Sequence, residues 1–319
     1  MRSGCLYIDG VDVYLRYGVF VIEGGWNELL SFPPLKAVTC NDWQEEDGVE
    51  ADLSAPVLDT REVTLKFAIA GAYDRYLDFL ALLSDSAVHT FRCPEIGRTF
   101  RLRLTRGGNA DLALRLGLFS LRFADDYPLD GYTYAAPTGG GVPPGDDYTL
   151  DGARFTDYGV RILQGAVSEI MKPPDVKTAM LRNIPTQAGA IYDTAGGVTY
   201  KAKDVRLSCL LRASDLPDMW RNYHALLYNL TKPDERSLGV TELAAELPCH
   251  YKQSSVSEFA VGVDGRPWVK FSLTLTLVRN FRIISGGEEV LVTEDGIPVV
   301  TEDGANLIAL AADNNTNNG

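Results

Sequence analysis

The sequence contains few of the residues that enzymes most often use for metal binding and proton transfer. Only three histidines occur among the 319 residues, and they are His89, His224 and His250. None lies at metal-ligand spacing from another histidine, and the adjacent pair Cys249-His250 would point to opposite faces of a strand. GxSxG, P-loop, GxGxxG and HExxH motifs are also missing. We therefore predict a protein that is not an enzyme, with no catalytic, metal-binding or cofactor-binding residues.

Paired cysteines and long apolar runs are lacking as well. The five cysteines are scattered, form no CxxC motif, and are Cys5, Cys40, Cys93, Cys209 and Cys249. An odd, scattered set predicts reduced and mostly buried thiols in a protein made in a cytoplasm. No apolar stretch follows Met1-Arg2, so we expect no signal peptide. No run approaches the 18 apolar residues of a membrane span, so we expect no membrane insertion.

Basic residues are in deficit. The chain has 30 lysines and arginines against 43 aspartates and glutamates, which gives a net charge of −13. Tight binding to nucleic-acid phosphates needs clustered basic side chains, so this balance argues against such a surface. One interpretation is an ordinary solvated acidic surface. A more specific interpretation is an acidic wall that repels DNA, so that DNA moves past it without binding. Composition leaves both open.

The chain does contain a pattern that occurs twice. The first occurrence comprises Tyr7-Ile-Asp9-Gly10, Tyr17-Gly18-Val19, Gly24, Pro33-Pro34 and Lys36. The second comprises Leu150-Asp151-Gly152, Tyr158-Gly159-Val160, Gly165, Pro173-Pro174 and Lys177, at an offset of 140 to 142 residues. Weaker matches follow in the same order, up to Phe119-Ser-Leu121 and Phe271-Ser-Leu273. The shared order predicts two tandem domains of one fold, which suits a prior of about 150 residues per domain.

Alternating apolar residues predict strands in both halves. The clearest are 63–69, 100–104 and 269–277, each with one face buried and one wet. Between Leu112 and Phe123 the alternation slips by one residue, which predicts a bulge or bend within one strand.

Each half also carries one amphipathic helical pattern. The first spans residues 73–83, with Tyr73, Tyr76, Leu77, Leu80 and Leu83 on one face. The second spans 216–230, with Asp215 as its N-cap and Pro217 in its first turn. We predict a mainly β fold in which each half is a sandwich or barrel flanked by one helix.

Composition shifts set the predicted boundaries. The first domain covers residues 1–124, a Gly/Pro-rich linker covers 125–147, and the second domain covers 148–285. Residues 286–319 form a β-turn arm, in which Val292-Thr-Glu-Asp-Gly296 recurs as Val300-Thr-Glu-Asp-Gly304, and then a disordered end. The paired acidic residues lack EF-hand spacing, so solvated turns are favoured over calcium sites.

Three of these motifs resemble a known family. Asp9-Gly10, Tyr17-Gly18-Val19 and the closing Val-Thr-Glu-Asp-Gly repeats resemble bacteriophage distal tail proteins and related tail-tube-type domains. Many distal tail proteins carry a galectin-like second domain, whereas here the second half repeats the first. This departure favours a baseplate hub with tandem tube domains.

The resemblance implies a structural role in the virion tail, in a protein made in the bacterial host cytoplasm. It implies a homo-oligomeric ring, a trimer or a hexamer, that seals the tube end, lines an acidic DNA channel and docks tail-tip proteins. Tail-tube and tail-tip proteins would be its partners, with DNA only as non-specific passing cargo. Strands 63–69, 100–104 and 269–277 would be the sheet edges that complete a barrel between subunits.

Two alternatives come from other classes. A carbohydrate-binding module or receptor-binding accessory protein could use Trp26, Trp43, Trp220 and Trp268 as a sugar groove, although core packing also explains these residues. A glycosidase would need a pair of carboxylates assembled by the fold.

Overall fold

The structure is a computed structural model of the chain. It describes residues 3–71, 73–113, 116–129, 131–178, 181–186, 188–192, 198–278, 288–290 and 308–310. The chain forms two compact units, Met1–Asn280 and Phe281–Gly319. In the smaller unit, β19 (Glu288–Val290) pairs antiparallel with β20 (Ile308–Leu310). The predicted turns at 292–296 and 300–304 and the predicted disordered end lie outside the described residues.

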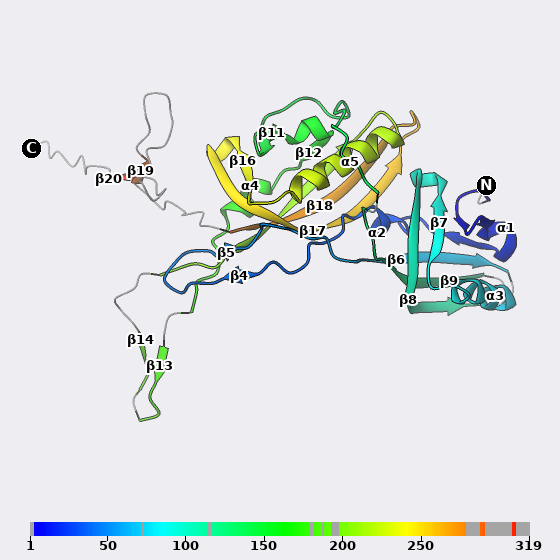
Figure 1. Cartoon of the computed structure of the whole chain (residues 1–319), viewed down its shortest axis with the longest axis horizontal. Helices are drawn as coiled ribbons and strands as arrows, with labels where there is room; N and C mark the ends of the chain where they lie inside the picture. Colours follow the sequence, from blue (N-terminus) through cyan, green and yellow to red (C-terminus); the bar gives the residue numbers. More distant parts are fainter. Residues whose placement is uncertain are drawn as a thin grey trace, which may run out of the picture. The chain divides into compact units, whose positions relative to one another are not determined.

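The larger unit contains two seven-stranded antiparallel sheets (Figure 1). The first has the order β2-β1-β7-β8-β9-β6-β3. Its strands are β1 (Tyr7–Ile8), β2 (Val11–Asp12), β3 (Val19–Val21), β6 (Arg61–Ala70), β7 (His89–Cys93), β8 (Arg98–Leu112) and β9 (Leu116–Asp125). We call residues 3–125 the first half.

The second sheet has the order β11-β10-β16-β17-β18-β15-β12, which is the same order position by position. Its strands are β10 (Tyr148–Leu150), β11 (Ala153–Arg154), β12 (Val160–Ile162), β15 (Lys203–Arg212), β16 (Arg236–Val240), β17 (Ala245–Val261) and β18 (Pro267–Leu277). We call residues 148–278 the second half. The prediction of a mainly β fold is confirmed.

Each sheet curls around one long helix, α3 (Tyr73–Ser84) in the first half and α5 (Leu216–Leu230) in the second. The shorter helices are α1 (Val13–Tyr17), α2 (Asn27–Leu30) and α4 (Ala166–Met171). Asp215 caps α5, because its side chain accepts a hydrogen bond from the backbone N–H of Asp218 at 2.8 Å, as the sequence predicted. In α3 the packed face is narrower than predicted. Phe79 and Leu83 are buried, but Tyr73 and Leu77 are 54% and 47% exposed.

Two short antiparallel pairs lie outside the main sheets. They are β4 (Cys40–Asn41) with β5 (Glu50–Ala51), and β13 (Leu181–Asn183) with β14 (Ala190–Tyr192). Each pair lies between the short helix and the first long strand of its half, so the two pairs occupy equivalent places in the chain.

The repeated Asp-Gly motif makes the same turn in both halves. Asp9 and Asp151 have positive φ angles of 49° and 50°, which Asp tolerates better than most residues. Their side chains accept backbone hydrogen bonds, both at 2.8 Å, from Thr90 in β7 and Ser237 in β16. The motif therefore fixes the first hairpin of each sheet to the neighbouring strand.

The repeated Tyr-Gly-Val motif also has one role in both halves. Gly18 and Gly159 have φ angles of 71° and 66°, and their carbonyls accept hydrogen bonds from Ala70 and Arg212 at the ends of β6 and β15. A Cβ on Gly18 would lie 2.2 Å from the Ala70 carbonyl oxygen. Glycine is needed because both the conformation and the close backbone contact exclude a side chain.

One local prediction was wrong. The slip between Leu112 and Phe123 is not a bulge in one strand, because Leu112 ends β8 and Leu116 begins β9. The β9 strand itself pairs with β6 without a register shift. Residues 13–17 form α1, because Asp12 caps this helix by accepting hydrogen bonds from the backbone N–H groups of Tyr14 and Leu15.

The three strands predicted as sheet edges lie inside the sheets. Residues 269–277 belong to β18, which pairs with β17 on one side and β15 on the other. Residues 63–69 lie in β6, which pairs with β9 throughout and with β3 only at residues 67–69. Residues 100–104 lie in β8, which pairs with β7 up to Leu102 and with β9 from Arg103. The alternation of buried and exposed residues correctly predicted these strands. Alternation along one strand does not show which other strands lie beside it in the sheet. Among the described residues, no helix combines the length and the apolar character needed to cross a membrane.

We expect Gly18→Ala to be destabilising by about 1–3 kcal/mol, because the new Cβ adds a backbone clash to a strained φ angle. Gly10→Ala is the matched control, since Gly10 also has a positive φ of 81° but a Cβ added there would meet nothing within 4 Å. Urea unfolding of both variants measures the difference. Equal losses in the two variants would show that the Ala70 contact contributes nothing.

Candidate functional site

A long segment of the first half lies on the second half. We call residues 31–58 the strap; it leaves α2, contains β4 and β5, and returns to β6 (Figure 1). The backbone N–H of Leu35 donates to the Lys252 carbonyl of β17 at 3.1 Å. The N–H of Val256, also in β17, donates to the Ser31 hydroxyl at 3.1 Å. The strap therefore satisfies backbone groups on the exposed side of a strand in the other half.

An aromatic side chain anchors the start of the strap. Phe32 is 3% exposed, and its ring lies 4.0 Å from that of Tyr223 in α5 and 6.0 Å from that of Phe271 in β18. The Tyr251 hydroxyl donates to the Pro33 carbonyl at 2.9 Å. Because Phe32 enters the core of the second half, separating the two halves would expose it to water.

The far end of the strap reaches the base of the β13–β14 hairpin. The Lys177 ammonium donates to the Trp43 carbonyl and pairs with Asp42, both at 2.6 Å. The backbone N–H of Gly48 donates to the Tyr200 carbonyl at 2.8 Å. The Lys177 side chain is only 2% exposed, so the strap covers its charge and supplies its partners.

A second contact joins the turn between β7 and β8 to helix α5. The Trp220 indole N–H donates to the Ile96 carbonyl at 2.7 Å. The Arg98 guanidinium lies 4.8 Å from the centre of a Trp220 ring and within 3.1 Å of the His224 ring nitrogens. This contact combines a cation–π interaction with a hydrogen bond in a site largely shielded from water.

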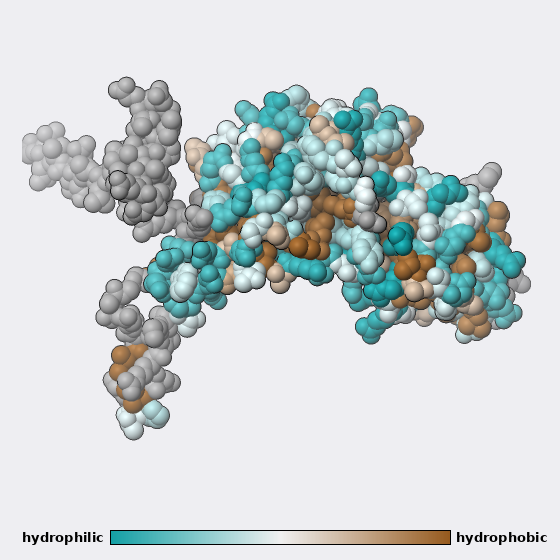
Figure 2. Space-filling view, viewed as in Figure 1, coloured by the Kyte–Doolittle hydropathy of each residue, from teal (hydrophilic) through white to brown (hydrophobic). Residues whose placement is uncertain are grey.

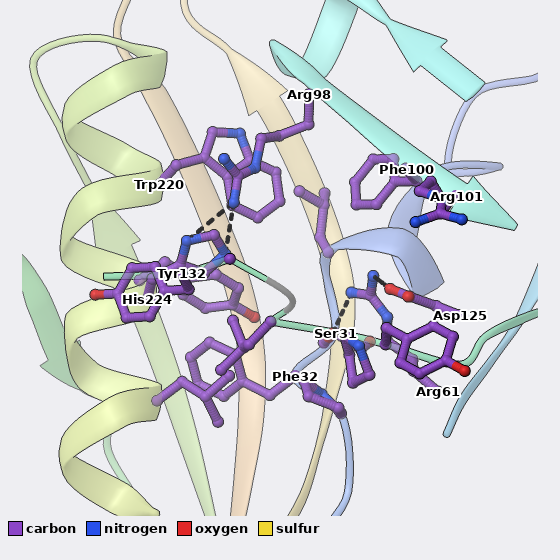
Figure 3. A pocket seen from close by; sticks show the side chains of 18 of the residues that line it. Ser31, Phe32, Arg61, Arg98, Phe100, Arg101, Asp125, Tyr132, Trp220 and His224 are labelled. Atoms are coloured by element: carbon purple, nitrogen blue, oxygen red, sulfur yellow. Dashed lines mark hydrogen bonds and ion pairs between the residues drawn. The ribbon is translucent and has the colours of Figure 1, made fainter. Parts of the chain in front are cut away.

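A cavity of about 380 Å³ lies between these contacts (Figure 3). Ser31, Phe32 and Arg61 from the first half line it together with Trp220 and His224 from α5. Figure 3 shows Arg98 and His224 on one side of this space and the Arg61–Asp125 pair on the other. The cavity is a gap in the junction between the halves, and residues of the chain that follows β9 also line it.

Arg61 holds both chain segments that leave the first half. Its guanidinium donates to the carbonyls of Leu29 and Ser31 at 2.8 and 3.0 Å, and it pairs with Asp125 at the end of β9. Arg61 is 8% exposed and Asp125 is 7% exposed. A buried pair of this kind adds little net stability, but removing one partner leaves an uncompensated buried charge.

The linker after β9 is bound to α5. The fully buried Asn222 accepts a hydrogen bond from the Thr138 N–H at 2.6 Å, and its amide donates to the Gly139 carbonyl at 3.3 Å. Arg221 donates to the Ala136 carbonyl at 2.6 Å. The glycine-rich stretch at 139–141 is therefore a docked connection between the halves.

His224 is held neutral by its surroundings. Burial, and then the neighbouring guanidinium groups of Arg98 and Arg61, lower the pKa of His224 to about 3. A neutral imidazole can accept a hydrogen bond from Arg98, whereas a protonated ring would place two cations in contact.

The structure places the other candidate residues apart from one another. His89 is buried against Asp9 of β1–β2, with a ring nitrogen 2.6 Å from the carboxylate, and His250 lies in β17. Cys93, Cys209 and Cys249 are buried and Cys40 is exposed, and no disulfide links the five cysteines, all of which lie in the described ranges. In the described part of the chain, no group of three or more His, Cys, Asp or Glu side chains could hold a metal ion.

The tryptophans do not form a common groove. Trp26 and Trp220 are 5% and 6% exposed, and their indole N–H groups are bonded to Glu95 and the Ile96 carbonyl. Trp43 lies on the strap and is 50% exposed. Two of the four rings are therefore used in packing and offer no stacking face for a sugar.

The chain has a distant structural neighbour among known proteins. No family model matches the chain, and no curated protein matches it. Among solved structures, the chain is similar to SPP1 Dit, described as a paradigm of the hub adsorption apparatus in phages that infect Gram-positive bacteria. The match has 15% identity and a TM-score of 0.30, and it covers 41% of this chain and 49% of that chain. The chain thus matches about half the length of SPP1 Dit, at a similarity below that which establishes a common fold.

The strap was not predicted from the sequence. Its residues show neither strand nor helix periodicity over a useful length, because they pack on a partner surface rather than on their own sheet. The one available signal was the pair Pro33-Pro34 and its repeat Pro173-Pro174, which end the short helices α2 and α4.

We expect Phe32→Ala to be destabilising by about 3–5 kcal/mol and to separate the unfolding of the two halves, because the strap loses its anchor. Val57→Ala is the control on the same strap, since Val57 is 54% exposed. Calorimetry measures both effects. A single unchanged transition for Phe32→Ala would contradict the role of this ring.

Stability should depend on pH through His224. In the unfolded chain its pKa is about 6.5, so the unfolded state binds a proton first and unfolding becomes easier as pH falls below that value. The expected loss is about 2 kcal/mol at pH 5. His224→Gln should remove this part of the slope between about pH 6.5 and 5. His250, whose pKa is also lowered by burial, remains in both proteins and cancels in the comparison. Parallel curves for the two proteins would contradict the assignment.

Proposed function

We propose that this protein is a structural component of a phage or phage-like injection machine, a ring-forming distal tail or tail-tube hub protein of the virion tail. In this role it seals the end of the tube, lines an acidic channel for passing DNA and docks tail-tip proteins. Three chains would supply six similar halves around a six-fold tube, and six chains would give two stacked rings.

The observation that carries the proposal is the repetition of one sheet topology. Two sheets of seven strands have the same order, the same Asp-Gly turn and the same Tyr-Gly-Val contact. Similar modules in one chain can occupy equivalent positions around a symmetry axis, as identical subunits do. We infer that the halves are copies of one fold and that the chain is a tandem pair of ring modules.

The junction between the halves supports a mechanical role. It combines the buried Phe32 ring, the Trp220–Arg98 contact and the Lys177 ion pair, and so links the modules over a long path. The exposed apolar residues Tyr73, Leu77, Leu116 and Leu118 are all more than 45% exposed and lie on α3 and β9. Apolar side chains on these two elements would become buried if this surface meets another subunit.

The net charge of −13 fits a channel through which DNA passes without binding. The carbohydrate-binding alternative gains no support, since Trp26 and Trp220 are buried.

The test is the mass and symmetry of the purified protein, by light scattering and negative-stain electron microscopy. We expect closed rings of three or six chains with a central hole. A strict monomer at a concentration of several milligrams per millilitre, together with glycan binding on an array, would replace this proposal with the carbohydrate-binding one.

A further inference from the structure

The second half has a segment equivalent to the strap. We call residues 172–178, 181–186, 188–192 and 198–202 the arm. The strap is closed at its base by a bridge between Leu35 and Leu58, and the arm by a bridge between Val176 and Tyr200. Next to each bridge, the N–H of Lys36 donates to the Val57 carbonyl at 2.9 Å, and that of Lys177 to the Thr199 carbonyl at 2.8 Å.

The elements from which the strap and the arm emerge are also equivalent. Arg61 at the start of β6 donates to carbonyls at the end of α2. Lys203 at the start of β15 donates to the Glu169 and Ile170 carbonyls of α4, at 2.8 and 2.6 Å. A basic side chain therefore fixes the exit of the segment in each half.

The strap and the arm differ in what they cover. The strap lies on the second half of its own chain, whereas the β13–β14 hairpin of the arm projects away from the second sheet (Figure 1). Val176, Ile191 and Val198 of the arm are 53%, 48% and 65% exposed. Figure 2 shows hydrophobic surface on this hairpin. Exposed apolar side chains on an arm of this kind are typical of a surface that another chain covers.

The first half carries the counterpart of the surface that the strap covers. On the second half the strap contacts β17 just beyond a register shift between Tyr251 and Gln253. In the first half β8 has a shift at the matching place, between Leu104 and Arg106. Residues 105–111 beyond it are all exposed.

The equivalent lysines of the two halves, Lys177 and Lys36, also differ in whether a segment covers them. Lys177 is buried because Asp42 and Trp43 of the strap cover it. Its counterpart Lys36 is exposed, and within the described residues its ammonium group has no ion pair. At the matching position of the arm, Ile184 corresponds to Trp43, so its backbone carbonyl would accept a hydrogen bond from Lys36.

We propose that the arm of one chain lies on the first half of a second copy, as the strap lies on the second half of its own chain. In this contact the β13–β14 hairpin reaches Lys36 of the second copy, and residues 172–178 of the arm lie along β8 beyond Leu104. The occupant is a second copy of this chain, because the receiving surface repeats one that the chain already binds.

Such a contact is head-to-tail, since the arm and its receiving surface are different parts of the molecule. A head-to-tail contact makes a closed ring when its rotation closes and a filament when it does not. The inference rests on the proposed function, and it deepens it by naming the surfaces through which the ring forms.

Two complementary variants test the contact. One replaces residues 181–192 with a short Gly-Ser linker and so removes the arm hairpin, and the other is Lys36→Glu in the receiving surface. Each alone should weaken self-association at least tenfold, with unchanged circular dichroism and melting temperature. Mixed together, the two variants should form a one-to-one heterodimer that grows no further. The Lys36→Glu variant keeps its arm, and this arm binds the intact receiving surface of the variant that lacks the hairpin.

Lys66→Glu is the control for the charge change, because Lys66 lies at an exposed position of β6. This variant should assemble like the wild type.

A disulfide tests the geometry. In a Cys40→Ser background, Lys36→Cys together with Ile184→Cys should give cross-linked multimers under oxidising conditions, and each single substitution should not. Val263→Cys with Lys36→Cys is the control, since Val263 is fully exposed at the turn between β17 and β18.

The outcomes separate the two proposals. Rings that persist without the arm hairpin, or that give no Lys36–Ile184 cross-link, overturn the arm contact and leave the ring. Cross-linked open filaments without rings support the arm contact and overturn the ring. Monomers without cross-links overturn both.

Discussion

The structure depends on one buried guanidinium. Arg61 lies at the start of β6 and bonds to the carbonyls where the strap begins and to Asp125 where the linker begins. The two connections between the halves therefore leave the first half at one fixed point. Because the charge is buried, its partners must all be present, and this requirement fixes the direction of both segments. The cavity lies beside Arg61, and Arg98 and Trp220, which contact each other, line it as well.

The two halves are similar in topology but differ in the surfaces they cover. The strap buries Phe32 against Tyr223, and the arm contains no phenylalanine at the matching place, where Lys172 is followed directly by Pro173-Pro174. The internal contact is thus built more strongly than the contact that we propose between chains. A stronger contact within the chain holds the two halves together, while a weaker contact between chains would make the proposed assembly depend on concentration.

Charge is used differently inside the junction and on the surface. The junction concentrates Arg61, Arg98 and a neutral His224, although the chain as a whole has a net charge of −13. Arg61 is paired with Asp125, and the Arg98 guanidinium lies over the Trp220 ring. A chain of net negative charge therefore contains a junction in which Arg61 and Arg98 are held by their own partners.

The sequence by itself determined the mainly β class, the long helix of each half and the repeated turns. Alternation in β6 and β18, the Asp215 cap and the positive φ positions at Asp9-Gly10 and Asp151-Gly152 all act over a few residues, so local pattern predicts them. The order of the strands, the path of the strap and the neutral state of His224 were decided only by the tertiary structure. Each of these depends on residues that are far apart in the chain, such as Phe32 with Tyr223 and Arg98 with His224, and no local pattern encodes which distant surface a segment will cover.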